Sequence, residues 1–99
     1  MNTDNLKQLF KRKEKVEREL KAFDFLLTAV SNLDKEFKGD YPWEIEFQYA
    51  ADMKTLTASS IEGSTVIDVI KFIKDKKEIE LVRLNEDITK EIKQIAGNN

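Results

Sequence analysis

The side chains that most often carry out catalysis or bind metals are scarce in this 99-residue sequence, which contains no histidine and no cysteine. Histidine is the usual general base near neutral pH and the commonest metal ligand, and cysteine supplies thiolate nucleophiles and zinc ligands. Serines at positions 59, 60 and 64 have no partner base to activate them. The three glycines are isolated, so we find no glycine-rich phosphate loop. We therefore expect no catalytic residues, no cofactor and no enzymatic activity.

Carboxylates are the remaining candidates for a metal or acid–base site. Glu44 and Glu46 are two residues apart, which places both on one face of a β-strand. Asp24 and Asp34 form a second acidic pair. Two exposed carboxylates without histidine are weak metal ligands. We therefore predict no metal site and no acid–base site among them.

Lys11, Arg12 and Lys13 lie in a basic stretch at helical spacing. One interpretation is a surface that binds phosphate groups or another anion. The other is a solvated helix face whose charge is balanced by the acidic end of a second helix. We favour the second interpretation because that acidic segment is present in the sequence. Nucleic-acid binding through this basic half of the first helix stays an alternative. So does binding of a small charged ligand at an oligomer interface.

A row of aromatic residues between positions 41 and 49 alternates with acidic residues. Aromatic side chains anchor protein interfaces, and they also stack on the bases of single-stranded nucleic acids. More often, such residues form the core-facing side of a strand. Residues 41–67 carry a net charge of −3, which repels phosphate and disfavours nucleic acid as a partner. The residues that we predict to bind a protein partner are Trp43, Glu44, Glu46, Phe47 and Tyr49.

Residues 4–38 are predicted to form one long helix. Apolar residues recur along it at alternating spacings of three and four, which is the heptad pattern of a helix that packs along one stripe. Lys13 and Asp34 interrupt this stripe. Gly39 and Pro42 follow the helix and are typical end signals. The stripe consists of Leu6, Leu9, Lys13, Val16, Leu20, Phe23, Leu27, Val30, Asp34 and Phe37.

Residues 65–96 are predicted to form a second long helix, and residues 65–68 match a capping box at its start. Lys77 interrupts its apolar stripe. If the helices pair antiparallel, we expect Lys77 to lie closer to Asp34 than to Lys13. The second stripe consists of Val66, Ile70, Ile73, Lys77, Leu81, Leu84, Ile88, Ile92 and Ile95.

Charge predicts the relative direction of the two helices. Residues 4–21 carry a net charge of +3 and residues 22–40 carry −2, whereas residues 68–77 carry +2 and residues 78–95 carry −2. An antiparallel pairing sets positive against negative at both ends, and a parallel pairing sets like against like. Single exposed pairs are weak, but a consistent pattern selects the direction of pairing. We therefore expect the helices to form an antiparallel, coiled-coil-like hairpin.

Residues 43–60 are predicted to form a β-hairpin between the helices. Apolar and polar residues alternate through the first strand, residues 54–60 return as the second strand, and residues 50–53 form the turn. An isolated hairpin is only marginally stable in water, so its apolar face needs a covering surface. That surface is either the adjoining ends of the two helices or a hairpin from another copy of the chain.

The helices carry more apolar residues than a pair of helices needs. A wide apolar stripe indicates more than one packing partner. We therefore predict that the chain assembles into a homodimer or a larger oligomer. The residues that we assign to the oligomer interface are Phe10, Phe25, Leu26, Ile79 and Val82.

These patterns predict one α+β domain over residues 1–99, mostly helical, in the order helix, β-hairpin, helix. The layout is similar to that of the β-type prefoldin subunit, which has longer helices; the likeness covers architecture alone. The N-terminal residues lack the apolar region of a signal peptide, and no apolar run approaches the roughly 18 residues of a membrane span. We therefore expect a cytoplasmic protein of a bacterial or phage-infected cell, with no membrane partner.

The predicted function is that of a non-catalytic protein-interaction module. Missing histidine and cysteine, the surplus apolar residues and the acidic hairpin all favour it. A small phage or mobile-element inhibitor that binds a host protein matches this profile, and so does a small assembly factor.

Overall fold

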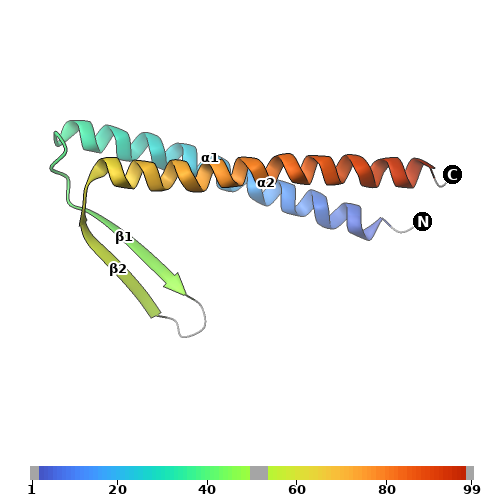
Figure 1. Ribbon diagram of the computed structural model, residues 1–99, viewed down its shortest axis with the longest axis horizontal. Helices are drawn as coiled ribbons and strands as arrows, with labels where there is room; N and C mark the ends of the chain where they lie inside the picture. Colours follow the sequence, from blue (N-terminus) through green and yellow to red (C-terminus); the bar gives the residue numbers. More distant parts are fainter. Residues whose placement is uncertain (1–2, 50–53, 98–99) are drawn as a thin grey trace. The chain divides into compact units, whose positions relative to one another are not determined.

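The structure is a computed structural model that describes residues 3–49 and 54–97. It confirms the predicted mostly helical fold, in which an antiparallel β-hairpin lies between two long helices (Figure 1). The predicted turn at residues 50–53 lies outside the described residues. Coiled-coil packing and oligomerisation stay predictions. The elements are α1 (Asp4–Glu36), β1 (Trp43–Tyr49), β2 (Lys54–Ile61) and α2 (Gly63–Gly97).

The chain divides into two compact units, to which both helices contribute. Unit 1 comprises Met1–Asp24 and Ile73–Asn99, and unit 2 comprises Phe25–Phe72. Unit 2 therefore holds the end of α1, the hairpin and the start of α2. The predicted single domain over residues 1–99 stays a prediction.

Six aliphatic side chains are buried among the described residues, three in each unit, and all six belong to the stripes predicted from the sequence. Two other stripe residues, Phe37 and Ile92, are exposed in the single chain. Phe37 follows the last residue of α1, where the helix no longer directs it toward α2. Ile92 lies near the end of α2, where it is opposite the beginning of the antiparallel α1 and few residues remain to cover it. The buried residues are Val16, Val30, Val66, Ile70, Leu84 and Ile88.

Within each unit the helices run antiparallel. In unit 1, Lys77 Nζ lies 2.8 Å from Glu19 Oε2, and Lys74 Nζ lies 2.6 Å from Asp24 Oδ1. In unit 2, Asp34 lies against Gly63. The expectation that Lys77 lies closer to Asp34 than to Lys13 was wrong, because the antiparallel register brings Lys77 level with Glu19.

α1 ends at Glu36, two residues earlier than predicted, in a Schellman motif. The Gly39 N–H donates to the Asp34 carbonyl at 2.9 Å, and the Lys38 N–H donates to the Lys35 carbonyl at 3.2 Å. Both Lys38 (φ 53°) and Gly39 (φ 82°) adopt left-handed backbone conformations. Gly39, the residue that predicted the end of the helix, is therefore the second left-handed residue. The first left-handed residue is Lys38.

α2 begins at Gly63, two residues before the predicted start. The Glu62 carbonyl accepts hydrogen bonds from the N–H groups of Thr65 and Val66, at 3.0 and 3.1 Å, so Glu62 takes the N-cap position. The predicted capping box over residues 65–68 was therefore wrong, because Thr65 lies inside the first helical turn.

The two strands pair in an antiparallel register that contains a β-bulge. Trp43 pairs with Ile61 and Ile45 pairs with Ala58, so β2 has one more residue than β1 between these pairs. Ser60 lies within the bulge and has a positive φ of 58°. From Ile45 to Gln48, pairing keeps apolar residues together on one face and polar residues on the other. The apolar residues of this hairpin face are Ile45, Phe47, Leu56 and Ala58.

Candidate functional site

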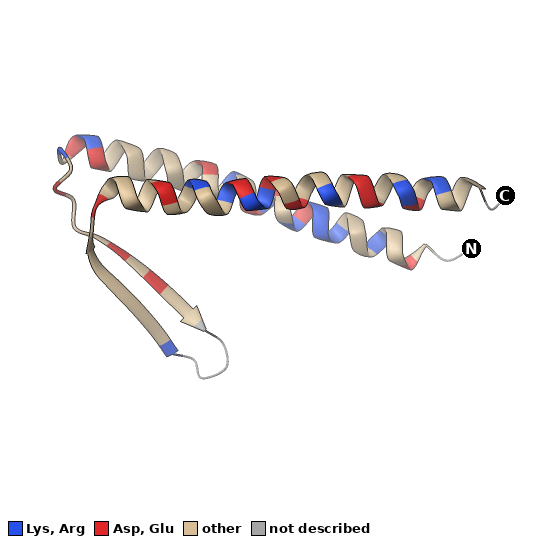
Figure 2. Cartoon of the chain, viewed as in Figure 1, with Lys and Arg blue, Asp and Glu red and all other residues tan. Residues whose placement is uncertain are grey.

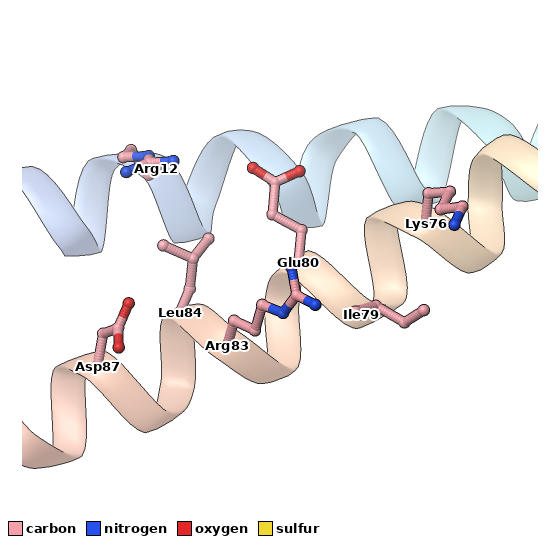
Figure 3. A pocket seen from close by; sticks show the side chains of 7 residues that line it. All are labelled: Arg12, Lys76, Ile79, Glu80, Arg83, Leu84 and Asp87. Carbon is pink, nitrogen blue, oxygen red and sulfur yellow. The ribbon is translucent and has the colours of Figure 1, made fainter.

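A hollow of about 470 Å³ lies on unit 1, between α2 and the first half of α1. Arg12 approaches it from α1, while Arg83 and Lys76 extend from α2 (Figure 3). Glu80 and Asp87 also line it, so three cationic groups face two carboxylates. Such a mixed lining can accept a small anion, although the acidic groups reduce the attraction. Arg12 was predicted from the sequence as an anion-binding residue. The charged lining residues of α2 were not predicted, because no local motif marks them.

The structure separates the three residues of the predicted anion-binding triad. Arg12 lines the hollow, Lys13 is half-buried along the stripe of α1, and Lys11 is exposed. Consecutive residues of a helix point about 100° apart, so three adjacent side chains do not converge on one ligand. Of the triad, Arg12 alone lines the hollow.

Ion pairs link the two helices at the end of unit 1 that is bounded by Asp24 and Ile73. The hydrogen bond from Lys77, together with the charge of that lysine, lowers the pKa of Glu19 from its usual value. The same bond raises the pKa of Lys77. The hydrogen bond to Asp24 likewise raises the pKa of Lys74. Each charged group is stabilised by its partner on the other helix, so these pairs serve structure and are not poised for proton transfer at neutral pH.

The predicted protein-binding residues of the hairpin lie on both of its faces. Phe47 belongs to the apolar hairpin face and is 56% exposed. Glu44 and Glu46 alternate with it along β1 and are exposed on the polar face. Trp43 is half-buried. The side chain of Tyr49 lies outside the described part of the structure.

An aromatic cluster lies at the corner where α1 meets the hairpin. The ring centroids of Tyr41 and Trp43 are 4.3 Å apart, and those of Phe37 and Tyr41 are 5.1 Å apart. Trp43 Nε1 and Asp34 Oδ1 are buried in unit 2 and have no hydrogen-bond partner among the described residues. The aromatic residues and the place of Asp34 on the stripe of α1 were predicted from the sequence, but the burial of one Asp34 carboxylate oxygen was not.

Large apolar side chains are exposed on both units. The five residues predicted for the oligomer interface are all at least 41% exposed in the single chain. Others join them on the hairpin, namely Phe47 and Leu56, and on the first turns of α2, namely Phe72. Figure 2 shows that the second half of α1 and most of β2 carry few charged residues. Phe47 and Leu56 of the hairpin and Phe25, Leu26 and Phe72 of the helices are thus exposed within the chain, and both surfaces proposed to cover the hairpin stay predictions.

The described residues contain no group of three or more acidic side chains that is arranged to hold a metal ion. None of the helices, over residues 4–36 and 63–97, has an apolar stretch long enough to cross a membrane.

No protein-family model, curated protein or solved structure matches this chain.

Proposed function

We propose that the chain is a non-catalytic protein-interaction module that self-associates through its apolar helix residues. Phe10, Phe25, Leu26, Ile79 and Val82 would form the interface between copies. The assembled protein would act as an inhibitor or assembly factor by binding another protein in the cytoplasm of a bacterial or phage-infected cell.

The observation that carries this proposal is the position of the phenylalanines. The chain contains six, and five of them are at least 41% exposed. The core is built from valine, leucine and isoleucine instead. Phenylalanine is among the side chains that stabilise a folded protein most when buried, and exposed apolar groups of this size mark interaction surfaces. A second copy of the chain is the simplest surface to cover them.

The test is the mass in solution by light scattering over a range of protein concentrations. We expect the wild type to be a dimer or larger, and a Phe10→Glu, Val82→Glu variant to be monomeric, because each glutamate would place a charge in an apolar contact. A Gln8→Glu, Gln94→Glu variant is the matched control, because it adds the same charge at exposed polar positions. Circular dichroism checks that all three remain helical. A wild type that is monomeric at every concentration would overturn the proposal.

A further inference from the structure

The hairpin face presents apolar side chains that its own chain leaves uncovered. Phe47 is 56% exposed and Leu56 is 63% exposed, and these two residues pair with each other across the strands. Ile45 and Ala58 form the neighbouring pair on the same face. A two-stranded sheet is marginally stable by itself, so covering this face would stabilise the hairpin as well as bury the rings.

Large apolar side chains are also exposed on the helices of the same unit. Phe25 is 78% exposed and Phe72 is 63% exposed. The ion pair between Asp24 and Lys74 sets the register of the helices, so Phe25 of α1 and Phe72 of α2 lie at the same level of the helix pair. We call Phe25, Leu26 and Phe72 the helix patch.

The backbone fixes the direction of the hairpin at both of its junctions. The non-glycine residues with positive φ in the described chain are Lys38, between α1 and β1, and Ser60, the second-last residue of β2. Such conformations are costly and persist where the surrounding structure determines them. Here the Schellman motif and the β-bulge do so. Phe47 and Leu56 of the hairpin face and the three residues of the helix patch are exposed in this arrangement.

We propose that two copies of the chain pair reciprocally, with the hairpin face of each copy lying on the helix patch of the other. This inference rests on the proposed self-association and specifies what meets Phe25 and Leu26 of that interface; it leaves the contacts of Phe10, Ile79 and Val82 as proposed above. Each copy offers both surfaces, so one two-fold operation buries all of them in two identical contacts.

The exposed area suits an interface of ordinary size. Phe25, Phe47 and Phe72 together expose roughly 400 Å², taking about 200 Å² for a whole ring. A stable interface buries about 800 Å² on each partner. Three rings therefore supply about half of what one copy must contribute, before Leu26, Leu56 and their neighbours are included.

Charge favours the helix patch over a second hairpin as the surface that meets the hairpin face. The described residues of the two strands carry Glu44 and Glu46 against Lys54. Glu44 and Glu46 lie on the polar face, whereas Lys54 is two residues from Leu56 and lies on the hairpin face. Two hairpin faces in contact would therefore bring two lysines into one interface, which is unfavourable. Residues 25–33 of α1 carry no charged side chain, so they do not repel the hairpin. Contact between two hairpins would also leave Phe25, the most exposed of these rings, uncovered.

The test mixes two charged variants, Phe25→Arg and Phe47→Glu, and measures association by light scattering. Alone, each variant breaks both contacts of the reciprocal dimer, and we expect its association to be at least about 30-fold weaker than that of the wild type. Mixed, they form a heterodimer in which one contact is wild type and the other pairs the introduced arginine of one copy with the introduced glutamate of the other. We therefore expect the mixture to recover a dimer.

The outcomes separate this inference from the proposed function. If the wild type is monomeric, self-association itself fails. If the wild type associates and Phe25→Arg leaves its mass unchanged, or the mixture does not recover a dimer, the reciprocal contact alone is overturned.

Cross-linking keeps the test decisive if a charged variant does not fold. The chain contains no cysteine, so single introduced cysteines give no background. We expect chains with Leu56→Cys to form disulfides with chains carrying Phe25→Cys more readily than either does with itself. Thr55→Cys is the matched control, because it neighbours Leu56 but lies on the polar face of the hairpin. Preferential cross-linking of Leu56→Cys with itself would show contact between hairpins and overturn the inference.

Discussion

Units 1 and 2 each contain segments of both helices with buried aliphatic residues between them. They differ in the side chains that flank these buried residues. Unit 1 carries 13 basic and 11 acidic residues, whereas unit 2 carries four basic and eight acidic residues. The ion pairs from Lys74 and Lys77 of α2 to carboxylates of α1 lie in unit 1. Among the described residues, six of the ten large exposed apolar side chains lie in unit 2, with four in unit 1.

This difference separates the pairing of the helices from the surface that they present. Three aliphatic residues are buried between the helices in each unit. In unit 1 the flanking charges select the antiparallel register. In unit 2 the flanking positions are largely apolar, and a glycine permits close approach of the helices. The stripe therefore determines the fold, and the residues beside it determine what each unit can contact.

Truncating core residues should destabilise both units alike and have the largest effect. Ile70→Ala in unit 2 and Leu84→Ala in unit 1 should each lower the free energy of unfolding by about 2–5 kcal/mol, because each leaves a cavity. Chemical denaturation followed by circular dichroism measures this. The loss should be present at every protein concentration.

Phe25→Ala is the comparison for these variants, because it removes a larger but mostly exposed side chain. If its effect on stability arises from association, it should shrink as the protein is diluted. A loss of more than about 2 kcal/mol that does not depend on concentration would show that Phe25 stabilises the single chain.

Gly63→Ala tests the close approach of the helices in unit 2. Gly63 is buried, and a Cβ there would overlap the Asp34 carboxylate, so we expect a loss of about 1–3 kcal/mol. Gly97→Ala is the control, because a Cβ there meets open space. In an Asp34→Ala background the cost of Gly63→Ala should fall by at least half. An unchanged cost would show that the carboxylate is not the obstacle.

Acid should weaken the ion pairs of unit 1, with the smallest effect. Since the pKa of Glu19 is lowered from 4.5 in the folded state, its contribution is present above that value and is lost as the pH falls through the folded pKa. Between about pH 5 and 3 the wild type should lose a few tenths of a kcal/mol more than a Glu19→Gln variant. Thermal unfolding at each pH measures the difference. Equal losses would mean that this pair contributes nothing measurable.

The periodicity of the sequence predicted most of the helical framework. All six buried residues, from Val16 to Ile88, were assigned to the stripes, because a repeat of three and four leaves few alternatives for a long helix. The alternation of residues 43–49 located β1, and the boundaries of the helices differed by two residues at the hairpin side of each.

The features that the sequence did not reveal depend on contacts between distant residues. Nothing local indicates that Gly63 lies against Asp34 or that Ser60 adopts a positive φ in a bulge. The start of α2 was misplaced because the N-cap residue is Glu62, whose carbonyl accepts the first hydrogen bonds of the helix. Thr65 was expected to be the N-cap residue. Whether the hairpin face lies on its own helices depends on the geometry of both junctions, which no residue type determines alone.

Trp43 is the one tryptophan of the chain and lies at the corner between helix and hairpin. Its indole lies against the Tyr41 ring at a tilt, and its nitrogen is buried in unit 2. Indole emission depends on polarity and on neighbouring rings, so the unlabelled protein carries an optical probe at one defined place. A change in how the hairpin leaves α1 would alter the colour and intensity of that emission, while events confined to the far ends of the helices would leave it unchanged.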